Sequence, residues 1–347
     1  MSIMCLRSSA RANRAAVAAA VALAWLSFGA PEVYAQALPP GVSPTGSVGG
    51  LEAKFVDVKG VRTRYYEAGQ GEPMILIHGE GFSGHSGANT WDKVIPGLAK
   101  RFHVFAFDKL ASGMTGNPLD DKDMNLQGEV EHAYQFIQTL KLGRVHLVGQ
   151  SRGGGCVFFL SVAHPEIVKT LTIVDSNTAA PDTGPTTRQA ALADCPNEPD
   201  CAEWQCRLRA ISHLPDVAFD DLFFRTGCYL ASLPKAQETL KKLAAGAGQP
   251  LRSQFGEFKK QVHERVMNES VLMMPILIYW GKNDPSAILR NGLALLEVVT
   301  AKNPNVRMLI ANNAGHFHYR EHPEEFTQNV VNFVDYWNRQ PATQGAR

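Results

Sequence analysis

Short apolar runs alternate with amphipathic helical patterns along most of the chain. Apolar runs bounded by turn residues predict buried strands over 74–77, 103–107, 145–148, 171–174, 275–279 and 306–310. Between these runs, apolar residues three and four positions apart predict helices over 89–101, 126–140, 153–163, 288–299 and 323–337. Strands that are apolar at nearly every position are typical of a mostly parallel sheet with helices on both faces. The pattern therefore predicts an α/β fold that begins with a hairpin over 55–68.

The alternation of strands and helices stops in one long stretch, between residues 177 and 270. This stretch carries more charge, a helical pattern over 235–245 and four clustered cysteines. We interpret it as a helical cap inserted between two strands of the core. The predicted organisation is a lead-in over 36–52 that is rich in proline and glycine, a core over 53–176 and 271–338, a cap over 177–270, and a C-terminal tail over 339–347.

The first 35 residues have the pattern of an export signal. Three arginines precede an apolar run over 15–28, and small residues then flank a cleavage site (Arg7, Arg11, Arg14; Val33, Ala35). The apolar run is shorter than the roughly 20 residues of a membrane-spanning helix, and an uncleaved anchor is the alternative interpretation. We expect cleavage after Ala35, no stable membrane insertion of the mature chain, and a periplasmic or secreted protein.

The cysteines of the cap are compatible with export. Cys195, Cys201, Cys206 and Cys228 contain no C-x-x-C pair, so their spacing does not indicate a zinc site. In an oxidising compartment one or two disulfides would form among them, although free thiols packed between helices are the alternative. The sequence leaves all three possible pairings open.

Composition and charge narrow the class of partner. The 347 residues are 45% hydrophobic and 19% charged, with a formal net charge of +1. A chain of this size and composition buries an extensive core, which excludes disordered and small disulfide-scaffold classes. It contains no cluster of Lys and Arg of the kind that binds phosphates, so we expect no nucleic-acid partner. We expect a small-molecule carbonyl substrate, no cofactor and no metal, while the oligomeric state cannot be predicted.

A candidate nucleophile follows the strand predicted over 145–148. The segment Gly149-Gln-Ser151-Arg-Gly153 lies between this strand and a predicted helix, which is the context that gives the G-x-S-x-G pattern its meaning. A sharp turn there exposes the serine hydroxyl at the end of the sheet, and only glycine fits the crowded flanking positions. The sequence therefore predicts Ser151 as a catalytic nucleophile.

A serine nucleophile needs a base and an acid that orients the base. His316 follows the last predicted strand, where this fold order places the base, and His318 is the nearby alternative. Asp284 follows the strand over 275–279 and gives the order Ser, Asp, His along the chain. Asp175, at the end of an earlier strand, is the competing acid.

Backbone amides must hold the negative charge that develops on a substrate carbonyl oxygen. The residue after the nucleophile, Arg152, supplies one such amide. The second comes from the glycine-rich loop after the strand over 74–77, where either Glu80 or Gly81 can donate. These three residues form the predicted oxyanion hole.

Together these motifs resemble the α/β-hydrolase fold, and within it the meta-cleavage product hydrolases, which split a carbon–carbon bond in ring-fission dienoates. The matching stretches are His78-Gly79-x-Gly81, Asp108 to Pro118, Gly149 to Gly154, Trp280 to Asp284, and Gly315 to Pro323. The resemblance implies a serine triad and degradation of aromatic compounds. It also implies that Asn89 contacts the dienoate and that a cap arginine binds its carboxylate. Arg225 is our first counterpart for this arginine, and Arg188 is the second.

The chain departs from that family in three respects. Glu80 replaces a usual glycine, Gln150 replaces a smaller polar residue, and ring-fission enzymes usually lack an export signal. These departures favour a serine hydrolase that cleaves an ester or lactone of a small, largely apolar substrate. The alternative is hydrolysis of a carbon–carbon bond in a vinylogous diketone or dienoate. A binding protein that kept the fold would lack a member of the triad, and none is missing from the sequence.

Overall fold

The structure is a computed structural model that describes residues 38–82, 84–197 and 200–340. The predicted export signal over 1–35, the first two residues of the lead-in and residues 341–347 of the tail lie outside this part of the chain.

Eight strands form one sheet, and most neighbouring strands in it are parallel. In chain order the strands are β1 (Ala53–Val58), β2 (Val61–Ala68), β3 (Glu72–Ile77), β4 (Phe102–Phe107), β5 (Val145–Gln150), β6 (Val168–Val174), β7 (Ile276–Gly281) and β8 (Val306–Ala311). Their order across the sheet is β1-β2-β4-β3-β5-β6-β7-β8. The β1–β2 and β2–β4 pairs are antiparallel and all other pairs are parallel, which confirms the predicted mostly parallel sheet.

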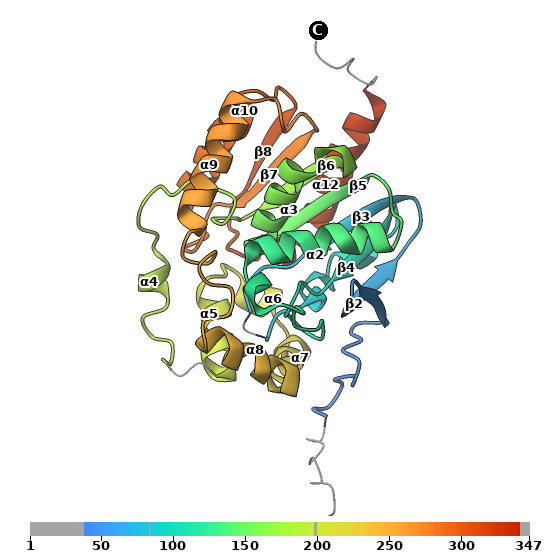
Figure 1. Ribbon diagram of the computed structural model, residues 1–347, viewed down its shortest axis with the longest axis vertical. Helices are drawn as coiled ribbons and strands as arrows, with labels where there is room; N and C mark the ends of the chain where they lie inside the picture. Colours follow the sequence, from blue (N-terminus) through green and yellow to red (C-terminus); the bar gives the residue numbers. More distant parts are fainter. Residues whose placement is uncertain (1–37, 83, 198–199, 341–347) are drawn as a thin grey trace, which may run out of the picture. The chain divides into compact units, whose positions relative to one another are not determined.

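Helices cover both faces of this sheet, as the apolar strands predict. The helices α2 (Leu126–Thr139), α3 (Arg152–Ala163), α9 (Phe255–Asn268) and α10 (Leu289–Thr300) contribute side chains to the core on one face, and Figure 1 shows them side by side. The helices α1 (Ile95–Leu98) and α12 (Pro323–Arg339) belong to the core on the other face. Strand residues alternate between the two cores: Ile75 and Ile77 face one, and Met74 and Leu76 the other.

Short helices between β6 and α9 form the cap. They are α4 (Arg188–Ala191), α5 (Cys201–Ala210), α6 (Pro215–Ala218), α7 (Asp221–Ser232) and α8 (Pro234–Ala244). Trp204 of α5 is fully buried and stacks on Phe223 of α7. A Cβ atom at Gly227 would lie 2.2 Å from the Trp204 ring, so α7 can approach α5 only because this position is glycine.

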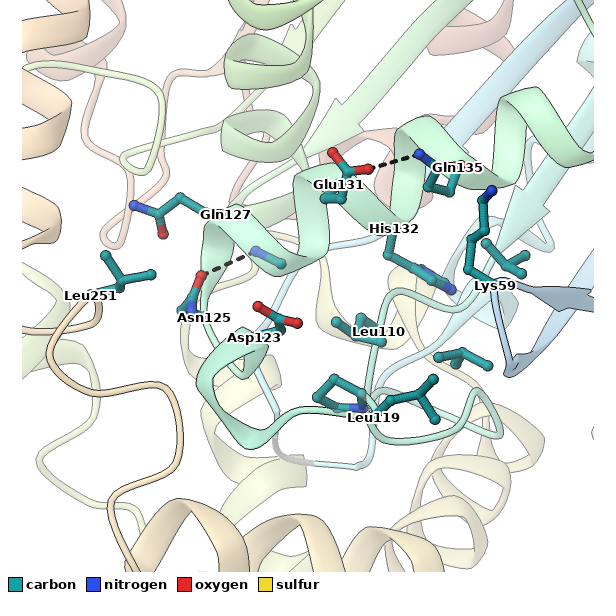
Figure 2. A pocket seen from close by; sticks show the side chains of 14 residues that line it. Lys59, Leu110, Leu119, Asp123, Asn125, Gln127, Glu131, His132, Gln135 and Leu251 are labelled. Atoms are coloured by element: carbon teal, nitrogen blue, oxygen red, sulfur yellow. Dashed lines mark hydrogen bonds between the residues drawn. The ribbon is translucent and has the colours of Figure 1, made fainter.

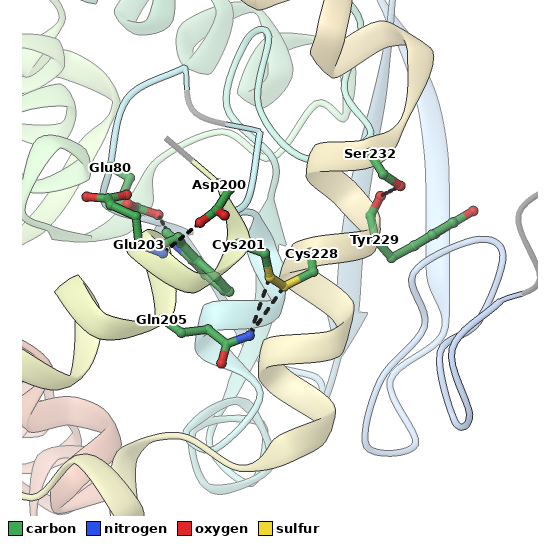
Figure 3. Close-up of a disulfide and its surroundings, with 9 residues drawn as sticks. Glu80, Asp200, Cys201, Glu203, Gln205, Cys228, Tyr229 and Ser232 are labelled. Carbon is green, nitrogen blue, oxygen red and sulfur yellow. Dashed lines mark hydrogen bonds between the residues drawn. A yellow bond between two sulfur atoms is a disulfide. The ribbon is translucent and has the colours of Figure 1, made fainter. Parts of the chain in front are cut away.

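Two disulfides fix α5 within the cap. Cys195 pairs with Cys206, and Cys201 pairs with Cys228, so the structure selects one of the three pairings that the sequence leaves open. Figure 3 shows the second disulfide, which joins the first turn of α5 to α7. The side-chain amide of Gln205 contacts both of its sulfur atoms, at 3.4 and 3.5 Å.

Two elements differ from the sequence-based expectations. The helix predicted over 89–101 is divided into a 3-10 turn, Ala88–Trp91, and the short α1, because Pro96 supplies no amide hydrogen and restricts the residue before it. Helix α9 falls in the range predicted for the cap, but it packs on the core: Phe255 and Phe258 contact Phe159 of α3. The apolar spacing of α9 is the same for a cap helix and a core helix, so the sequence could not distinguish them. Among the described residues, no helix has the length and apolar character needed to cross a membrane.

Candidate active site

Four of the predicted catalytic residues follow parallel strands and therefore meet at one edge of the sheet. Ser151 follows β5, Asp175 follows β6, Asp284 follows β7 and His316 follows β8. In open α/β sheets, ligands bind outside the carboxyl ends of the strands, where loops can be shaped without disturbing the core. The topology thus brings together residues that are up to 165 positions apart in the sequence (316 − 151).

Ser151 occupies the sharp turn that the sequence predicts. Its φ angle of 53° is in the left-handed region, which an L-residue adopts only under constraint. A Cβ atom at Gly149 would lie 2.2 Å from the Gly153 carbonyl oxygen, and one at Gly153 would lie 2.2 Å from the Ile77 carbonyl oxygen. The two glycines therefore let the strand, the turn and α3 approach closely enough to project the serine at the helix N-terminus.

His316 and Asp284 form a buried hydrogen-bonded pair. The Nδ1 atom of His316 lies 2.6 Å from Oδ2 of Asp284, and both residues are at least 95% buried. The other carboxylate oxygen of Asp284 accepts hydrogen bonds from the amides of Ser286 (2.7 Å) and Ala287 (2.9 Å), which fixes its orientation. Burial lowers the pKa of His316, but the charge and hydrogen bond of Asp284 outweigh burial and raise it above its ordinary value.

The backbone of His316 is held from two sides. The side-chain amide of Gln150 donates to the His316 carbonyl oxygen at 2.9 Å, and the His316 amide donates to the carbonyl oxygen of Ile211 in the cap at 3.0 Å. Gln150 thus connects the nucleophile turn to the histidine loop. Ser151 and His316 line the same cavity without a direct hydrogen bond between their side chains, a contact that often tightens when substrate binds.

The competing acid and the competing base form a second pair. Nδ1 of His318 lies 2.6 Å from Oδ2 of Asp175, and Oδ1 of Asp175 accepts a hydrogen bond from the Gly281 amide at 2.7 Å. Burial, followed by the nearby charge of Asp284, raises the pKa of Asp175 well above its ordinary value, and burial lowers the pKa of His318 to about 3. Neither residue lines the cavity next to Ser151. The geometry therefore groups Asp284 with His316 and separates Asp175 and His318 from them.

The predicted oxyanion loop lies directly against the nucleophile. A Cβ atom at Gly79 would lie 3.0 Å from the Ser151 Cβ, so only glycine allows this approach. Glu80 follows in a left-handed conformation, with a φ of 55°. Within the described part of the chain, no backbone acceptor pairs with the amides of Glu80, Gly81 or Arg152. These amides are therefore free to donate to a substrate oxygen.

The carboxylate of Glu80 is neutralised by the cap. It lies 2.8 Å from the guanidinium of Arg207, accepts a hydrogen bond from the Trp204 indole at 3.1 Å, and accepts another from the Ser86 hydroxyl. Figure 3 shows Glu80 close to Glu203 on α5. Burial raises the pKa of Glu80, but Arg207 and these donors outweigh it and lower the pKa. The carboxylate that replaces glycine thus ties the loop to the cap, and Arg207 offsets its repulsion of an anion.

A cavity of about 160 Å³ joins these groups. It is lined by Glu80, Gln150, Ser151, Arg188, Arg207, Leu208, Ile211, Ser286, His316 and Phe317. Arg207 is paired with Glu80 and Glu203, whereas Arg188 forms no ion pair with any residue that the structure describes. Burial, followed by the charge of Arg207, lowers the pKa of Arg188 from its ordinary value. The cavity wall therefore contains a guanidinium that has no direct ion-pair partner among the described residues, although the charges of Glu203 and Glu80 act on it from farther away.

The structure does not bring the two predicted substrate contacts, Arg225 and Asn89, to this cavity. Arg225 is on α7, where its half-exposed guanidinium pairs with Asp221 one helical turn earlier at 3.0 Å. Asn89 is buried in a 3-10 turn, and its side-chain oxygen lies 3.5 Å from the guanidinium of Arg64. The roles of Arg225 and Asn89 were inferred from their positions in the sequence. Which arginine reaches the cavity depends instead on the path that the cap takes in space. Arg188, the second candidate from the sequence, does line this cavity.

Larger cavities do not contain the nucleophile. One of about 420 Å³ is lined by Gly81 and Arg152 but not by Ser151 or His316. Another, of about 470 Å³, lies beside α2 with Leu119, His132 and Leu251 in its wall, as Figure 2 shows. None of the predicted site residues lines it. Among the described residues, no group of three or more His, Cys, Asp or Glu side chains is arranged to hold a metal ion.

Comparison with known proteins agrees with this geometry. The profile of the alpha/beta hydrolase fold family matches residues 72–323, so the chain belongs to this family and is a hydrolase.

Particular relatives narrow the comparison. The chain is 29% identical over 284 residues to the 2-hydroxy-6-oxo-6-(2'-aminophenyl)hexa-2,4-dienoic acid hydrolase of Metapseudomonas resinovorans, covering 81% of this chain and 90% of that protein. It is 26% identical to a 2-hydroxy-6-oxononadienedioate/2-hydroxy-6-oxononatrienedioate hydrolase of Paraburkholderia xenovorans, covering 81% and 95%. The crystal structure of a serine hydrolase involved in carbazole degradation superposes with a TM-score of 0.63 at 25% identity, covering 82% and 99%.

Proposed function

We propose that this protein is a serine hydrolase that cleaves a carbon–carbon bond in a small, carboxylate-bearing dienoate ketone. This is the alternative among the sequence-based interpretations, and the names of the relatives support it better than the ester or lactone reaction. The observation that carries it is the guanidinium of Arg188, which has no direct ion-pair partner among the described residues and lies in the wall of the cavity that contains Ser151. A carboxylate at one end of the substrate would pair with this guanidinium and place the ketone at the other end.

The triad supplies the nucleophile. Nδ1 of His316 is engaged by Asp284, so Nε2 is the atom available to accept the proton of Ser151. The Ser151 oxygen then adds to the ketone carbon, and the amides of Arg152 and of Glu80 or Gly81 hold the resulting oxyanion. The raised pKa of His316 means that the imidazolium formed in this step is stabilised by Asp284.

Collapse of the oxyanion breaks the carbon–carbon bond. Before Ser151 adds, the dienol must tautomerise, so that its 2-hydroxyl becomes a ketone and the carbon bonded to the 6-ketone becomes saturated. The electron pair of the broken bond then delocalises from that carbon through the remaining double bond onto the 2-oxo oxygen, and His316 returns its proton to the same carbon. An acyl ester on Ser151 remains, and water hydrolyses it with His316 again as the base. The net change is addition of one water molecule, which gives a carboxylic acid and a shortened enoate. Arg188 would stabilise the carboxylate while negative charge develops in the conjugated leaving group.

The size of the cavity supports a small substrate. A volume of about 160 Å³ is below the roughly 300–1,000 Å³ that is usual for drug-sized ligand sites. Leu208, Ile211 and Phe317 provide its apolar wall. We therefore expect faster turnover of dienoate ketones with a short acyl group than of those with a biaryl group.

We also propose that the protein works outside the cytoplasm. The pattern of the first 35 residues and the two disulfides of the cap support this location, since disulfides persist in oxidising compartments. A fusion of residues 1–40 to a reporter enzyme that is active only after export would test it. An inactive fusion retained in the cytoplasm would contradict this location.

The reaction is tested with paired substrates. A 2-hydroxy-6-oxo-dienoate and an aryl ester that share one acyl group are presented to the purified protein, and kcat/KM is measured for each, with the corresponding lactone as a third substrate. We expect the dienoate to be preferred and its carboxylate methyl ester to be turned over poorly. Efficient hydrolysis of the ester or lactone without turnover of the dienoate would overturn the proposal and support the ester reaction.

A further inference from the structure

A buried lysine lies behind the oxyanion loop and is not explained by the triad. Lys109 follows β4, its side chain is fully buried, and its ammonium donates to the Glu80 carbonyl oxygen at 2.6 Å. The same ammonium lies 3.2 Å from a carboxylate oxygen of Glu129 on α2. Removing an ammonium group from water costs free energy unless the group is paired with a negative charge and hydrogen-bonded. Glu129 and the Glu80 carbonyl offset this cost for Lys109.

Glu129 connects this lysine to the nucleophile turn. Its second carboxylate oxygen lies 2.6 Å from Nε of Arg152, and its side chain is fully buried. Arg152 carries the first predicted oxyanion amide, and Glu80 belongs to the loop that carries the second. One hydrogen bond, from Lys109 to the Glu80 carbonyl, and the ion pairs of Glu129 with Lys109 and Arg152 therefore connect the two sides of the predicted oxyanion hole. Neither Lys109 nor Glu129 lines the cavity.

The loop contains a second contact of the same kind. The backbone amide of Lys109 donates to Nε2 of His78 at 3.1 Å, so this nitrogen is unprotonated and Nδ1 carries the hydrogen. Nδ1 then donates to the Gly79 carbonyl oxygen at 2.8 Å. Burial, followed by the charge of Lys109, lowers the pKa of His78 well below its ordinary value, which keeps the ring neutral in this tautomer.

These contacts fix the direction of two consecutive peptide groups. In a trans peptide the carbonyl and the amide hydrogen point to opposite sides. His78 holds the Gly79 carbonyl, which directs the Glu80 amide hydrogen to the other side of the loop, and Lys109 holds the Glu80 carbonyl, which does the same for Gly81. His78 and Lys109 do not line the cavity, whereas Glu80 does.

We propose that Lys109, fixed by Glu129, is a positioning residue that holds the oxyanion loop with its amide hydrogens directed toward the Ser151 cavity. Glu80 needs this support because its φ of 55° is unfavourable for a residue other than glycine. The inference rests on the proposed function in that Ser151 is the nucleophile, but it applies to any acyl or phosphoryl group that Ser151 attacks.

The test uses an uncharged dialkyl fluorophosphate, because its reaction with Ser151 places negative charge on a phosphoryl oxygen and needs no knowledge of the substrate. The second-order rate constant of adduct formation at Ser151 is measured by intact-protein mass spectrometry for the wild-type chain and for Lys109→Met. We expect a rate lowered about 10- to 100-fold, since loss of one oxyanion donor costs about 10²- to 10³-fold in catalysis. For the natural substrate, kcat should fall while KM changes little.

Lys235→Met is the matched control. Lys235 is a half-buried lysine that also donates to a backbone carbonyl, that of Gly113 at 3.3 Å, and it forms no hydrogen bond with the oxyanion loop. We expect wild-type labelling of this variant. If Lys109→Met does not fold, as judged by circular dichroism, Lys109→Gln and Glu129→Gln carry the test, because both keep a polar side chain of similar volume.

The outcomes separate the two proposals. Labelling of the wild-type chain at Ser151 with an equal rate in the Lys109 variants would overturn the positioning role alone. Equal slowing in the Lys235→Met control would also overturn it, because the effect would then reflect any buried lysine. Absence of an adduct at Ser151 in the wild-type chain would refute the proposed nucleophile and, with it, the positioning role.

Discussion

The two buried aspartate–histidine pairs give the most discriminating prediction about the site. Asp284→Asn removes the carboxylate charge next to His316, and Asp175→Asn makes the same replacement of the carboxyl group next to His318. The substitutions are chemically identical and both sites are buried, so a difference in their effects reports the role of each pair rather than burial itself. We expect Asp284→Asn to abolish most of the activity and Asp175→Asn to act mainly on stability.

The magnitude follows from the geometry of His316 and Asp284. Their hydrogen bond is 2.6 Å long, and two unit charges about 4 Å apart at an effective dielectric constant of about 20 interact by about 4 kcal/mol. This attraction stabilises the imidazolium that forms in the transition state, so its loss corresponds to a decrease of about a thousandfold in kcat/KM. The asparagine amide would also favour the tautomer of His316 with a hydrogen on Nε2, which cannot accept the serine proton.

Asp175→Asn leaves His316 and its partner in place. It removes a carboxylate that is hydrogen-bonded to His318 and to the Gly281 amide, and the expected loss is about 1–3 kcal/mol of the free energy of unfolding. The assay measures kcat/KM per folded molecule, with the folded fraction determined by circular dichroism. Loss of turnover per folded molecule in Asp175→Asn, with turnover retained in Asp284→Asn, would refute the assignment and transfer the acid role to Asp175.

Three further predictions address pH, substrate charge and the cap. Asp284 raises the pKa of His316, and this histidine must be neutral to accept a proton. We therefore expect kcat/KM to fall as the pH decreases through an apparent pKa above 6.5. A decrease of kcat/KM that begins only at a lower apparent pKa would contradict this prediction. Arg188→Gln should raise KM for a carboxylate-bearing dienoate about 10- to 100-fold, because it removes about 1.5–3 kcal/mol of charge-assisted hydrogen bonding. Arg225→Gln is the control and should leave KM unchanged. An equal increase of KM in both variants would refute the role of Arg188. The disulfides close loops of 11 and 27 residues, so their reduction should lower the free energy of unfolding by about 3 kcal/mol for a single loop. It should also slow turnover, because α5 is no longer fixed in the cap. Denaturation and kinetics with and without reductant measure both effects, and unchanged kinetics would contradict a role of α5 in the active site.

The sequence predicted the parts of the molecule that depend on local pattern. The glycine-flanked turn at Ser151 needs a strand before it and a helix after it, and both were visible as short apolar runs. The acid and base are placed by chain order in this fold, and the structure joins Asp284 to His316 as expected.

The remaining features depend on contacts between distant segments. Arg188, rather than Arg225, reaches the cavity because of the path that α4 and α5 take, which no periodicity specifies. The pairing of Lys109 with Glu129 joins residues 20 positions apart on different elements, and each alone resembles an ordinary surface charge. The role of Glu80 was likewise hidden, because its partner Arg207 is 127 positions away (207 − 80).

The central claim is that Ser151 initiates cleavage of a carbon–carbon bond in a dienoate ketone. The most direct measurement is turnover of a 2-hydroxy-6-oxo-dienoate by the wild-type chain and by Ser151→Ala, followed by loss of the dienoate absorbance and by identification of the acid and the shortened enoate. The account predicts both products from the wild-type chain and neither from Ser151→Ala. Formation of both products by Ser151→Ala at the wild-type rate, or their absence with the wild-type chain, would contradict it.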